Sequence, residues 1–290
     1  MKKTIIIALG VSLMFLLNGC KSDASIKDGA SQSVSKGTGN GYDLKFNLKP
    51  GTSYFFKSEI EQNTETMGMK SKSEIDATYS YLVKGAKDGN LILEVIYDKM
   101  EGSVEAMGSK TKYSSDDKGA GSGVYGAFVG KPLNITVTKT GKIISIDNVD
   151  FLNNSKGFSK DDLTQSMGMS MDIYPDHPVK IGDSWTKETE SKFQNLSMKL
   201  ISNYKLVSVA ANVATLQMSG EIKMDQNVKA QEGMQMKLGG SQEGVLKIDI
   251  SSGMAISGDL NQKIKGELNM QGNAMPLSMD SKIKLSGTEK

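Results

Sequence analysis

Apolar and polar residues alternate along most of the chain from Tyr42 onward. Segment 75–83 is the clearest example, because Ile75, Ala77, Tyr79, Tyr81 and Val83 are separated by mostly polar residues. A period of two is typical of a β-strand with one buried and one solvated face. Asp88-Gly89 follows this segment, and such a pair tolerates the positive φ values of a tight hairpin turn. The pattern therefore predicts a hairpin that returns along residues 91–97.

The last hundred residues contain five further alternating runs. Within each run the apolar positions stay on one side of the expected strand, which predicts a long antiparallel meander. Their apolar residues are Met198, Leu200, Tyr204 and Leu206; Leu216, Met218, Ile222 and Met224; Leu246, Ile248 and Ile250; Leu260, Ile264, Leu268 and Met270; and Met275, Leu277, Met279, Ile283 and Leu285.

The period changes between the two strand-rich regions. Ser159 followed by Asp162 is typical of a helix start, with a capping oxygen and an acid three residues later. We therefore predict one helix at about 159–171, ending before Pro175, within a helical connector over 148–180.

Two stretches of the chain echo each other. KPGTSY, which contains Gly51 and Tyr54, aligns with KIGDSW, which contains Gly182, Asp183 and Trp185. Both look like strand-entry motifs, and they predict an all-β, mainly antiparallel fold of two related β halves with one or two short helices. The halves are expected at 42–147 and 181–290, built as a sandwich or as a half-open barrel with an apolar inner face.

The first twenty residues are typical of an export signal. Lys2 and Lys3 precede an apolar run from Thr4 to Leu17, which is short for a helix that must cross roughly 30 Å of hydrocarbon. With Gly19 before Cys20, the segment resembles a bacterial lipoprotein signal; the alternative is an ordinary cleaved signal with an incidental cysteine.

The resemblance implies removal of residues 1–19 and a lipid such as palmitate on Cys20. Residues 20–41 then form the acylated cysteine and a flexible tether, because their Ser, Gly, Lys and Asp offer almost nothing to bury. The expected location is the cell envelope, most simply the outer membrane, with the periplasmic or surface face left open.

Charge and composition exclude several classes of function. The formal charge of +2 is carried by Lys2 and Lys3, and every basic residue is lysine, so no planar guanidinium fork is available for phosphate or guanine. We therefore expect no nucleic-acid partner. The sole cysteine, Cys20, leaves neither a disulfide nor a thiol nucleophile nor a thiolate metal site.

Few residues suggest catalysis. His177 is the only histidine and stands between two prolines, where an exposed turn residue is the simpler interpretation. Carboxylate pairs such as Asp116-Asp117 and Asp161-Asp162 are typical of solvated loops and helix starts, although glycoside hydrolases also use two carboxylates. We predict no enzymatic activity and no cofactor besides the covalent lipid.

Methionine is abundant, with 18 residues against 8 Phe and 1 Trp. Thioethers suit Cu(I), and residues at i and i+2 of a strand share a face, but methionine also fills irregular apolar interiors. The candidate metal or ligand residues are Met67, Met69, Met167, Met169, Met171, Met234 and Met236.

The order of a KPG-x-x-Y strand entry, GKPLNITVTKTGKI, YPDHPVKIGDSW and EGVLKIDISSG resembles an uncharacterised family of Gram-negative cell-envelope lipoproteins. These motifs are turn and strand-entry residues, so the resemblance implies a fold and carries no activity. The leading hypothesis is a non-catalytic, lipid-anchored binding module that holds an apolar ligand or an envelope protein partner. The alternatives are a purely structural surface lipoprotein and a methionine-rich periplasmic Cu(I)-binding protein.

Overall fold

A computed structural model describes residues 41–117, 129–151, 160–193, 196–224, 229–231, 234–270 and 273–290. Cys20, the predicted signal and nearly all of the predicted tether lie outside these residues. No helix among them is long and apolar enough to cross a lipid bilayer.

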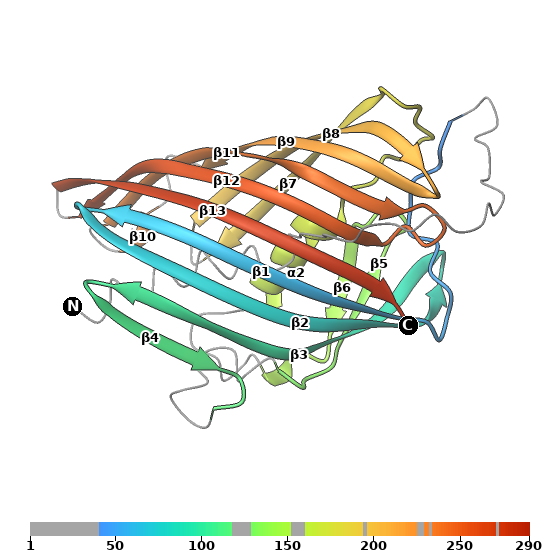
Figure 1. Ribbon diagram of the computed structural model, residues 1–290, viewed down its shortest axis with the longest axis horizontal. Coiled ribbons are helices and arrows are strands. Elements are labelled where there is room, and N and C mark those ends of the chain that lie inside the picture. Colours follow the sequence, from blue (N-terminus) through green and yellow to red (C-terminus); the bar gives the residue numbers. More distant parts are fainter. Residues whose placement is uncertain are drawn as a thin grey trace.

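Thirteen strands and one helix make up the described chain, as Figure 1 shows. The helix is α2 (Lys160–Met171), which agrees with the helix predicted at about 159–171. The strands are β1 (Ser53–Thr66), β2 (Met69–Lys87), β3 (Asn90–Ala106), β4 (Ser109–Ser114), β5 (Leu133–Val137), β6 (Ile143–Asp147), β7 (Ser184–Phe193), β8 (Leu196–Ala210), β9 (Val213–Met224), β10 (Lys229–Gln231), β11 (Met234–Asp249), β12 (Ala255–Met270) and β13 (Asn273–Glu289).

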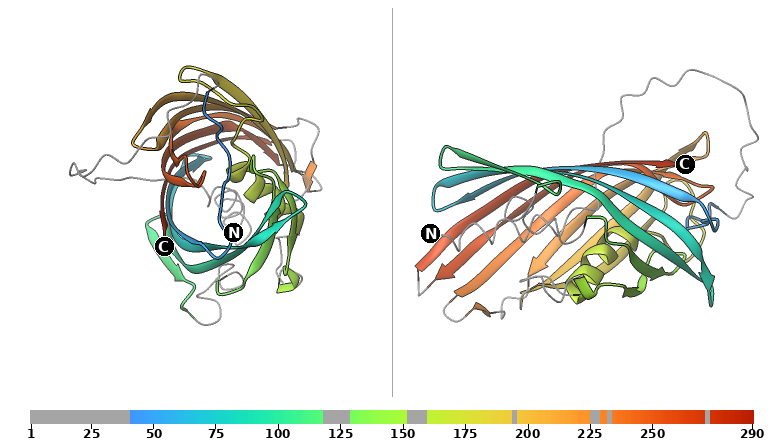
Figure 2. Two further views of the ribbon diagram at one scale, coloured as in Figure 1. Left: turned by 90° about the vertical axis from the view of Figure 1, so that its right-hand side faces the viewer. Right: turned by 90° about the horizontal axis from the view of Figure 1, so that it is seen from below.

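All the strands belong to one antiparallel sheet with the order β6-β5-β3-β2-β1-β13-β12-β11-β9-β8-β7. β4 and β10 extend it beside β3 and β11. The first and last strands, β1 and β13, pair along their lengths and join the two regions of the chain into one continuous sheet. The predicted all-β fold is confirmed, and the architecture is a single curved sheet rather than two stacked sheets (Figure 2).

Several hairpins turn at two residues with positive φ. Asp88 (φ 52°) and Gly89 (φ 80°) connect β2 to β3, which confirms the predicted turn. Met67-Gly68 and Met107-Gly108 have the same signs and connect β1 to β2 and β3 to β4. Paired positive φ values give these turns a twist that matches the right-handed twist of the strands.

The two predicted strand entries are built alike. Gly51 donates a backbone hydrogen bond to Val83 at 2.8 Å, and Gly182 donates one to Leu206 at 2.7 Å. Tyr54 then lies opposite Tyr81, and Trp185 lies opposite Tyr204. The sequence echo therefore corresponds to the same local backbone geometry at the start of β1 and of β7.

The segment 42–48 crosses one end of the sheet. Tyr42 exchanges two backbone hydrogen bonds with Val179, Phe46 donates to Lys139 at 2.8 Å, and Asn47 donates to Ser252 at 2.8 Å. Lys139 lies in the β5–β6 turn and Ser252 lies in the β11–β12 turn, so the segment connects distant parts of the sheet. Figure 2 shows the segment passing across the opening at this end of the curved sheet, and we therefore call this end the closed end.

Helix α2 packs against β6 and β7, the two edge strands of the main strand path. Leu163, Met167 and Met171 are its buried side chains. The helix therefore spans the gap between the edges of the curved sheet near the closed end (Figure 2).

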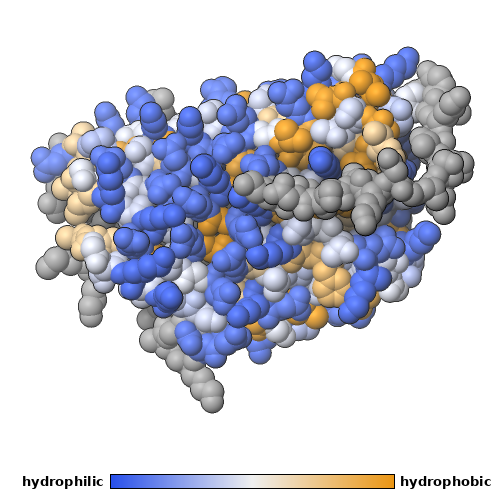
Figure 3. Space-filling model, in the orientation of Figure 1, coloured by the Kyte–Doolittle hydropathy of each residue, from blue (hydrophilic) through white to orange (hydrophobic). Residues whose placement is uncertain are grey.

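Charged side chains cover the outer face of the sheet. Lysines and carboxylates pair across and along neighbouring strands, for example Lys72 with Glu61 at 3.3 Å and Lys99 with Glu101 at 2.8 Å. The surface over β1, β12 and β13 is accordingly mostly hydrophilic (Figure 3). The apolar residues of these strands face the interior of the curve.

Candidate functional site on the inner face

Strand register aligns the inward-facing residues of neighbouring strands into levels that run across the sheet. On β1 the buried residues are Tyr54, Phe56, Ser58, Ile60, Gln62 and Thr64, every second position of the strand. We call the surface formed by these positions and their register partners on the other strands the inner face. The apolar residues of the inner face belong to the hydrophobic core of the described chain.

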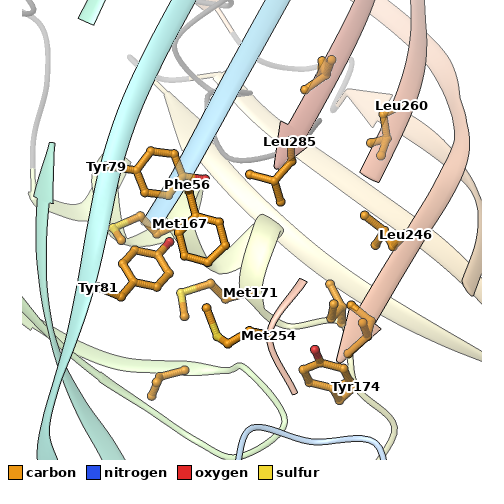
Figure 4. Packing of buried hydrophobic residues seen from close by; sticks show 14 of the residues in the cluster. Phe56, Tyr79, Tyr81, Met167, Met171, Tyr174, Leu246, Met254, Leu260 and Leu285 are labelled. Carbon is orange, nitrogen blue, oxygen red and sulfur yellow. The ribbon is translucent and has the colours of Figure 1, made fainter. Parts of the chain in front are cut away.

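Aromatic side chains line the inner face toward the closed end. Phe56 stacks on Tyr79 with ring centroids 5.2 Å apart and lies 5.1 Å from Tyr81. Figure 4 shows this cluster facing Met167 and Met171 of α2. Burial raises the pKa of both Tyr79 and Tyr81 well above the ordinary tyrosine value, so the cluster stays uncharged.

Two apolar levels cross the sheet farther from the closed end. One contains Ile60, Ile283, Leu260, Met218 and Tyr204, and all five are buried. The other level lies four residues away along each strand and contains Met279, Ile264, Ile222 and Leu200, which are also buried.

A polar level separates these two apolar levels. It runs across six strands, from β1 through β13, β12, β11 and β9 to β8; Gly220 occupies the position on β9, and the five polar residues on the other strands are 2–6% exposed. We call it the polar belt: Gln62, Ser281, Gln262, Gln242 and Ser202. Buried glutamine is uncommon, and three on one level of an apolar surface mark this level as chemically distinct.

Hydrogen bonds connect part of the belt. Gln242 Nε2 donates to Ser202 Oγ at 3.1 Å, and Gln62 Nε2 donates to Thr64 Oγ1 at 3.1 Å. Gln262 differs, because its Oε1 is buried without a hydrogen-bond partner. An acceptor in this position retains the capacity to bind a donor.

The belt ends beside an ion pair. Lys187 on β7 is the register partner of Ser202, and its Nζ lies 2.7 Å from Asp172 Oδ1 just beyond α2. Both side chains are about four-fifths buried, with exposed fractions of 20% and 19%. The belt therefore ends beside two opposite charges that neutralise each other.

The predicted methionine sites are spread over separate parts of the fold. Met67 lies in the β1–β2 turn and Met69 at the first position of β2, and both are exposed. The arrangement of two sulfurs on one strand, expected from their spacing, is therefore not present at this pair. Met167 and Met171 belong to α2 and have buried side chains, and Met169 lies in the same helix.

Met234 and Met236 lie on β11, in register with Met270 and Leu268 of β12. Cys20 lies outside the described residues. The strand-entry residues Gly51, Tyr54, Gly182 and Trp185 lie at the closed end and have the structural role described above. Asp183 belongs to the same turn, where its carboxylate accepts a hydrogen bond from Lys180 N at 2.8 Å.

The candidate catalytic residues His177, Asp116 and Asp117 are exposed. His177 is exposed, with Nδ1 2.7 Å from Asp176 Oδ1, and this contact lowers the pKa of Asp176. Asp116 pairs with Lys99 at 3.3 Å on the outer surface. In the described ranges, no three His, Cys, Asp or Glu side chains come together in a way that could hold a metal ion.

A cleft of about 430 Å³ lies on the outer side, at the end of the sheet opposite the closed end. Its lining is mostly charged or polar, and Lys70 there lies 3.9 Å from Glu65. Met107 of the β3–β4 turn contributes its apolar side chain. The cleft is a small, mostly polar surface feature, and Thr64 is the inner-face residue of β1 that contributes to it.

Sequence reasoning missed the polar belt, although a signal for it was present. The apolar runs skip one position in several strands, at 202, 220, 262 and 281. Each gap alone reads as an ordinary interruption. Only the register reveals that the gaps lie side by side.

Comparison with known proteins gives one family match. A model described only as a family of unknown function matches residues 88–155 and 153–255, together more than half of the chain. No curated protein matches.

Solved structures resemble the chain only distantly. A lipovitellin structure, titled for its lipid–protein interactions, matches 83% of the chain at 10% identity with a TM-score of 0.49, and the chain spans 25% of its length. An outer membrane channel from Pseudomonas putida F1 matches 88% of the chain and 100% of its own, at 8% identity and a TM-score of 0.26. A DUF1329 family protein from Desulfovibrio piger matches 80% of the chain and 84% of its own, at 8% identity and a TM-score of 0.15.

Proposed function

This chain belongs to DUF6263, a family of unknown function, and from the geometry of its inner face we propose that it is a non-catalytic binding module that holds an apolar ligand. We propose further that Cys20 carries the lipid that anchors the module in the cell envelope.

The observation that carries the proposal is the extent of the inner face. Apolar side chains continue from β2 across β1, β13, β12, β11 and β9 to β8 without a change of sheet. A stacked sheet would cover such a face with its own side chains, but here all the strands belong to one sheet. Among the described residues, α2 and segment 42–48 lie near one end of this surface, and we assign the remaining length of the curve to an apolar ligand.

The point at which the predicted tether joins the described chain fits this function. Residue 41 precedes Tyr42, which is fixed to Val179 at the closed end. A lipid on Cys20 would therefore place the closed end near the bilayer, within the roughly 25 Å reach of a flexible tether of about twenty residues. The opposite end, with the β1–β2 and β3–β4 turns, would face away from it.

The test is native mass spectrometry of the full-length protein, purified in a mild detergent, before and after extraction with organic solvent. We expect a co-purifying mass of lipid size that extraction removes. Leu268→Lys should reduce this mass, because it places a charge on a 7%-exposed position of the inner face. Val245→Lys is the matched control, since Val245 is 41% exposed on the outer face of the same sheet.

Circular dichroism of both variants shows whether each remains folded. A bare mass that extraction leaves unchanged would contradict the proposal and favour a structural surface lipoprotein. A mass that rises only after Cu(I) is added would instead favour the methionine-rich metal-binding alternative.

A further inference from the structure

The chemistry of the polar belt indicates what kind of apolar ligand the inner face accepts. The belt lies between two apolar levels, with Leu260 on one side of Gln262 and Ile264 on the other side along β12. A purely aliphatic ligand gains nothing from a row of buried amides and hydroxyls, because each of these groups loses water when it is covered. The belt therefore has a use only if the ligand carries a polar group at the same level.

The unpartnered atom defines that group. Gln262 is 2% exposed, and its Oε1 has no hydrogen-bond partner. A carbonyl oxygen of an amide only accepts hydrogen bonds. The complementary ligand group is therefore a donor, an O–H or an N–H.

The neighbouring amide donors in the belt are directed elsewhere. Gln242, the register partner of Gln262 on β11, donates through Nε2 to Ser202 on the far side. Gln62 on β1 donates through Nε2 to Thr64 and also lies 3.3 Å from Met279 Sδ. These contacts leave the acceptor of Gln262 in the middle of the belt for a group from outside the sheet.

Charge favours a neutral donor. The five belt residues are all uncharged types, and the adjoining Lys187 is paired with Asp172 at 2.7 Å. An ammonium group buried beside Gln262 would therefore lack a carboxylate to pair with in the belt, and burial of an unpaired charge is strongly unfavourable. A hydroxyl or an amide N–H meets the requirement without this cost.

We propose that the inner face binds an amphipathic lipid whose aliphatic chain is interrupted by a hydroxyl or amide group, and that Gln262 accepts a hydrogen bond from this group. The inference rests on the proposed function, because it requires that the inner face hold a ligand at all. It adds the position and the chemistry of the polar group.

The test compares two probes of the same chain length, stearate and its mid-chain hydroxy derivative, in binding to the full-length protein after organic extraction. We expect the hydroxy derivative to bind more tightly to the wild type by about three- to tenfold, the usual range for one neutral hydrogen bond. Gln262→Leu should abolish this preference while the affinity for stearate is kept or increased. Gln217→Leu makes the same change on the outer face of β9 and should leave the preference intact.

The outcomes separate the two proposals. If neither probe binds the wild type, the proposed function and this inference both fail. If both probes bind equally and Gln262→Leu changes neither affinity, the inner face binds apolar ligands but the assignment of Gln262 is wrong. If Gln262→Leu unfolds at the same temperature as the wild type or at a higher one, the lost preference does not come from an unfolded variant.

Discussion

Gln242 on β11 donates a hydrogen bond to Ser202 on β8, although β9 lies between the two strands. The donor Nε2 and the acceptor Oγ are 3.1 Å apart. The residue of β9 at this level is Gly220, the register partner of both. The absence of a side chain at Gly220 lets the glutamine amide pass over β9 and reach the serine.

A side chain at Gly220 should break this arrangement. A Cβ added there would lie 3.0 Å from both Cγ and Nε2 of Gln242 and 2.8 Å from the carbonyl oxygen of Ile201. We expect Gly220→Ala to lower the free energy of unfolding by about 1–3 kcal/mol, through overpacking and the loss of a buried hydrogen bond. Urea unfolding followed by circular dichroism measures this change.

Gly239→Ala is the matched control on β11. A Cβ at Gly239 would meet its nearest neighbour, the carbonyl oxygen of Ile222, at 3.6 Å, an ordinary contact distance. This variant should unfold within about 0.5 kcal/mol of the wild type or be slightly more stable. Equal unfolding midpoints for the two variants would show that Gly220 has no special role.

The polar belt also shows how far sequence reasoning reaches. Alternation predicted the strands, and Asp88-Gly89 predicted a hairpin, because both signals depend on residues close together in the chain. The belt joins Gln62 to Ser281 and Gln242 to Ser202, whose separations along the chain are large. Such levels depend on which strands are neighbours and in what register, and period-two patterns do not specify either.

The pairing of β1 with β13 was likewise beyond the sequence pattern. Ile60 lies opposite Ile283, but each residue fits equally well on any strand with an apolar inner face. At Met67 the sequence pattern gave a wrong prediction. Its spacing from Met69 suggested that both residues lie on one strand, whereas Met67-Gly68 forms a turn. Gly68 was the available signal, since glycine adopts positive φ without strain.

Closure of the sheet depends on a close backbone contact at Gly253. Gly253 has a φ of 73°, and a Cβ there would lie 2.0 Å from the carbonyl oxygen of Lys45 in segment 42–48. Tyr174 Oη also donates a hydrogen bond to the Gly253 carbonyl. We expect Gly253→Ala to destabilise the protein by about 3 kcal/mol or more, by combining backbone strain with displacement of this segment.

Gly89→Ala measures the cost of backbone strain without a steric clash. Gly89 has a similar φ of 80°, but nothing lies within 4 Å of an added Cβ. Its cost should be about 1–2 kcal/mol, the usual penalty for a left-handed residue with a side chain. Thermal and urea unfolding of Gly253→Ala and Gly89→Ala give the difference in their unfolding free energies. If both variants lose the same amount, the close contact between Gly253 and segment 42–48 does not contribute to stability.

Alkaline pH should destabilise the fold through its buried tyrosines. Burial and the nearby Glu289 carboxylate raise the pKa of Tyr54 from 10.0 to about 12, and burial raises the pKa of Tyr97 and Tyr204 further. A raised folded-state pKa means that the unfolded chain ionises first. This contribution to stability is complete below pH 10 and is lost as the pH rises through about 12.

The measurement is urea unfolding at a series of pH values, with phenolate absorbance recorded alongside. We expect the unfolding midpoint to fall above pH 10 and the phenolate signal of these tyrosines to appear together with unfolding. Tyr54→Phe should reduce the slope of this dependence. Complete ionisation of all tyrosines at their ordinary pKa, with the fold intact, would show that they are accessible to solvent.

The stability of the fold at acid pH should depend on the charge of Glu74. Hydrogen bonds from Lys72, Lys110 and Ser103 lower the pKa of Glu74 from 4.5 to about 2. Since the folded-state pKa is lowered, the stabilisation is present above pH 4.5 and is lost as the pH falls through about 2. The side chain is 41% exposed, so solvent screening should limit the effect of Glu74→Gln at neutral pH to about 1 kcal/mol or less.

Glu61→Gln is a suitable control, because Glu61 contacts the same Lys72 at 3.3 Å from the neighbouring strand β1. Urea unfolding of both variants at pH 7 and at successively lower pH values tests the assignment. The difference between wild type and Glu74→Gln should shrink as Glu74 takes up its proton, and should exceed that of Glu61→Gln at pH 7, because Glu74 also contacts Lys110 and Ser103. A difference that stays constant from neutral pH to about 2 would mean that the Glu74 charge does not contribute to stability.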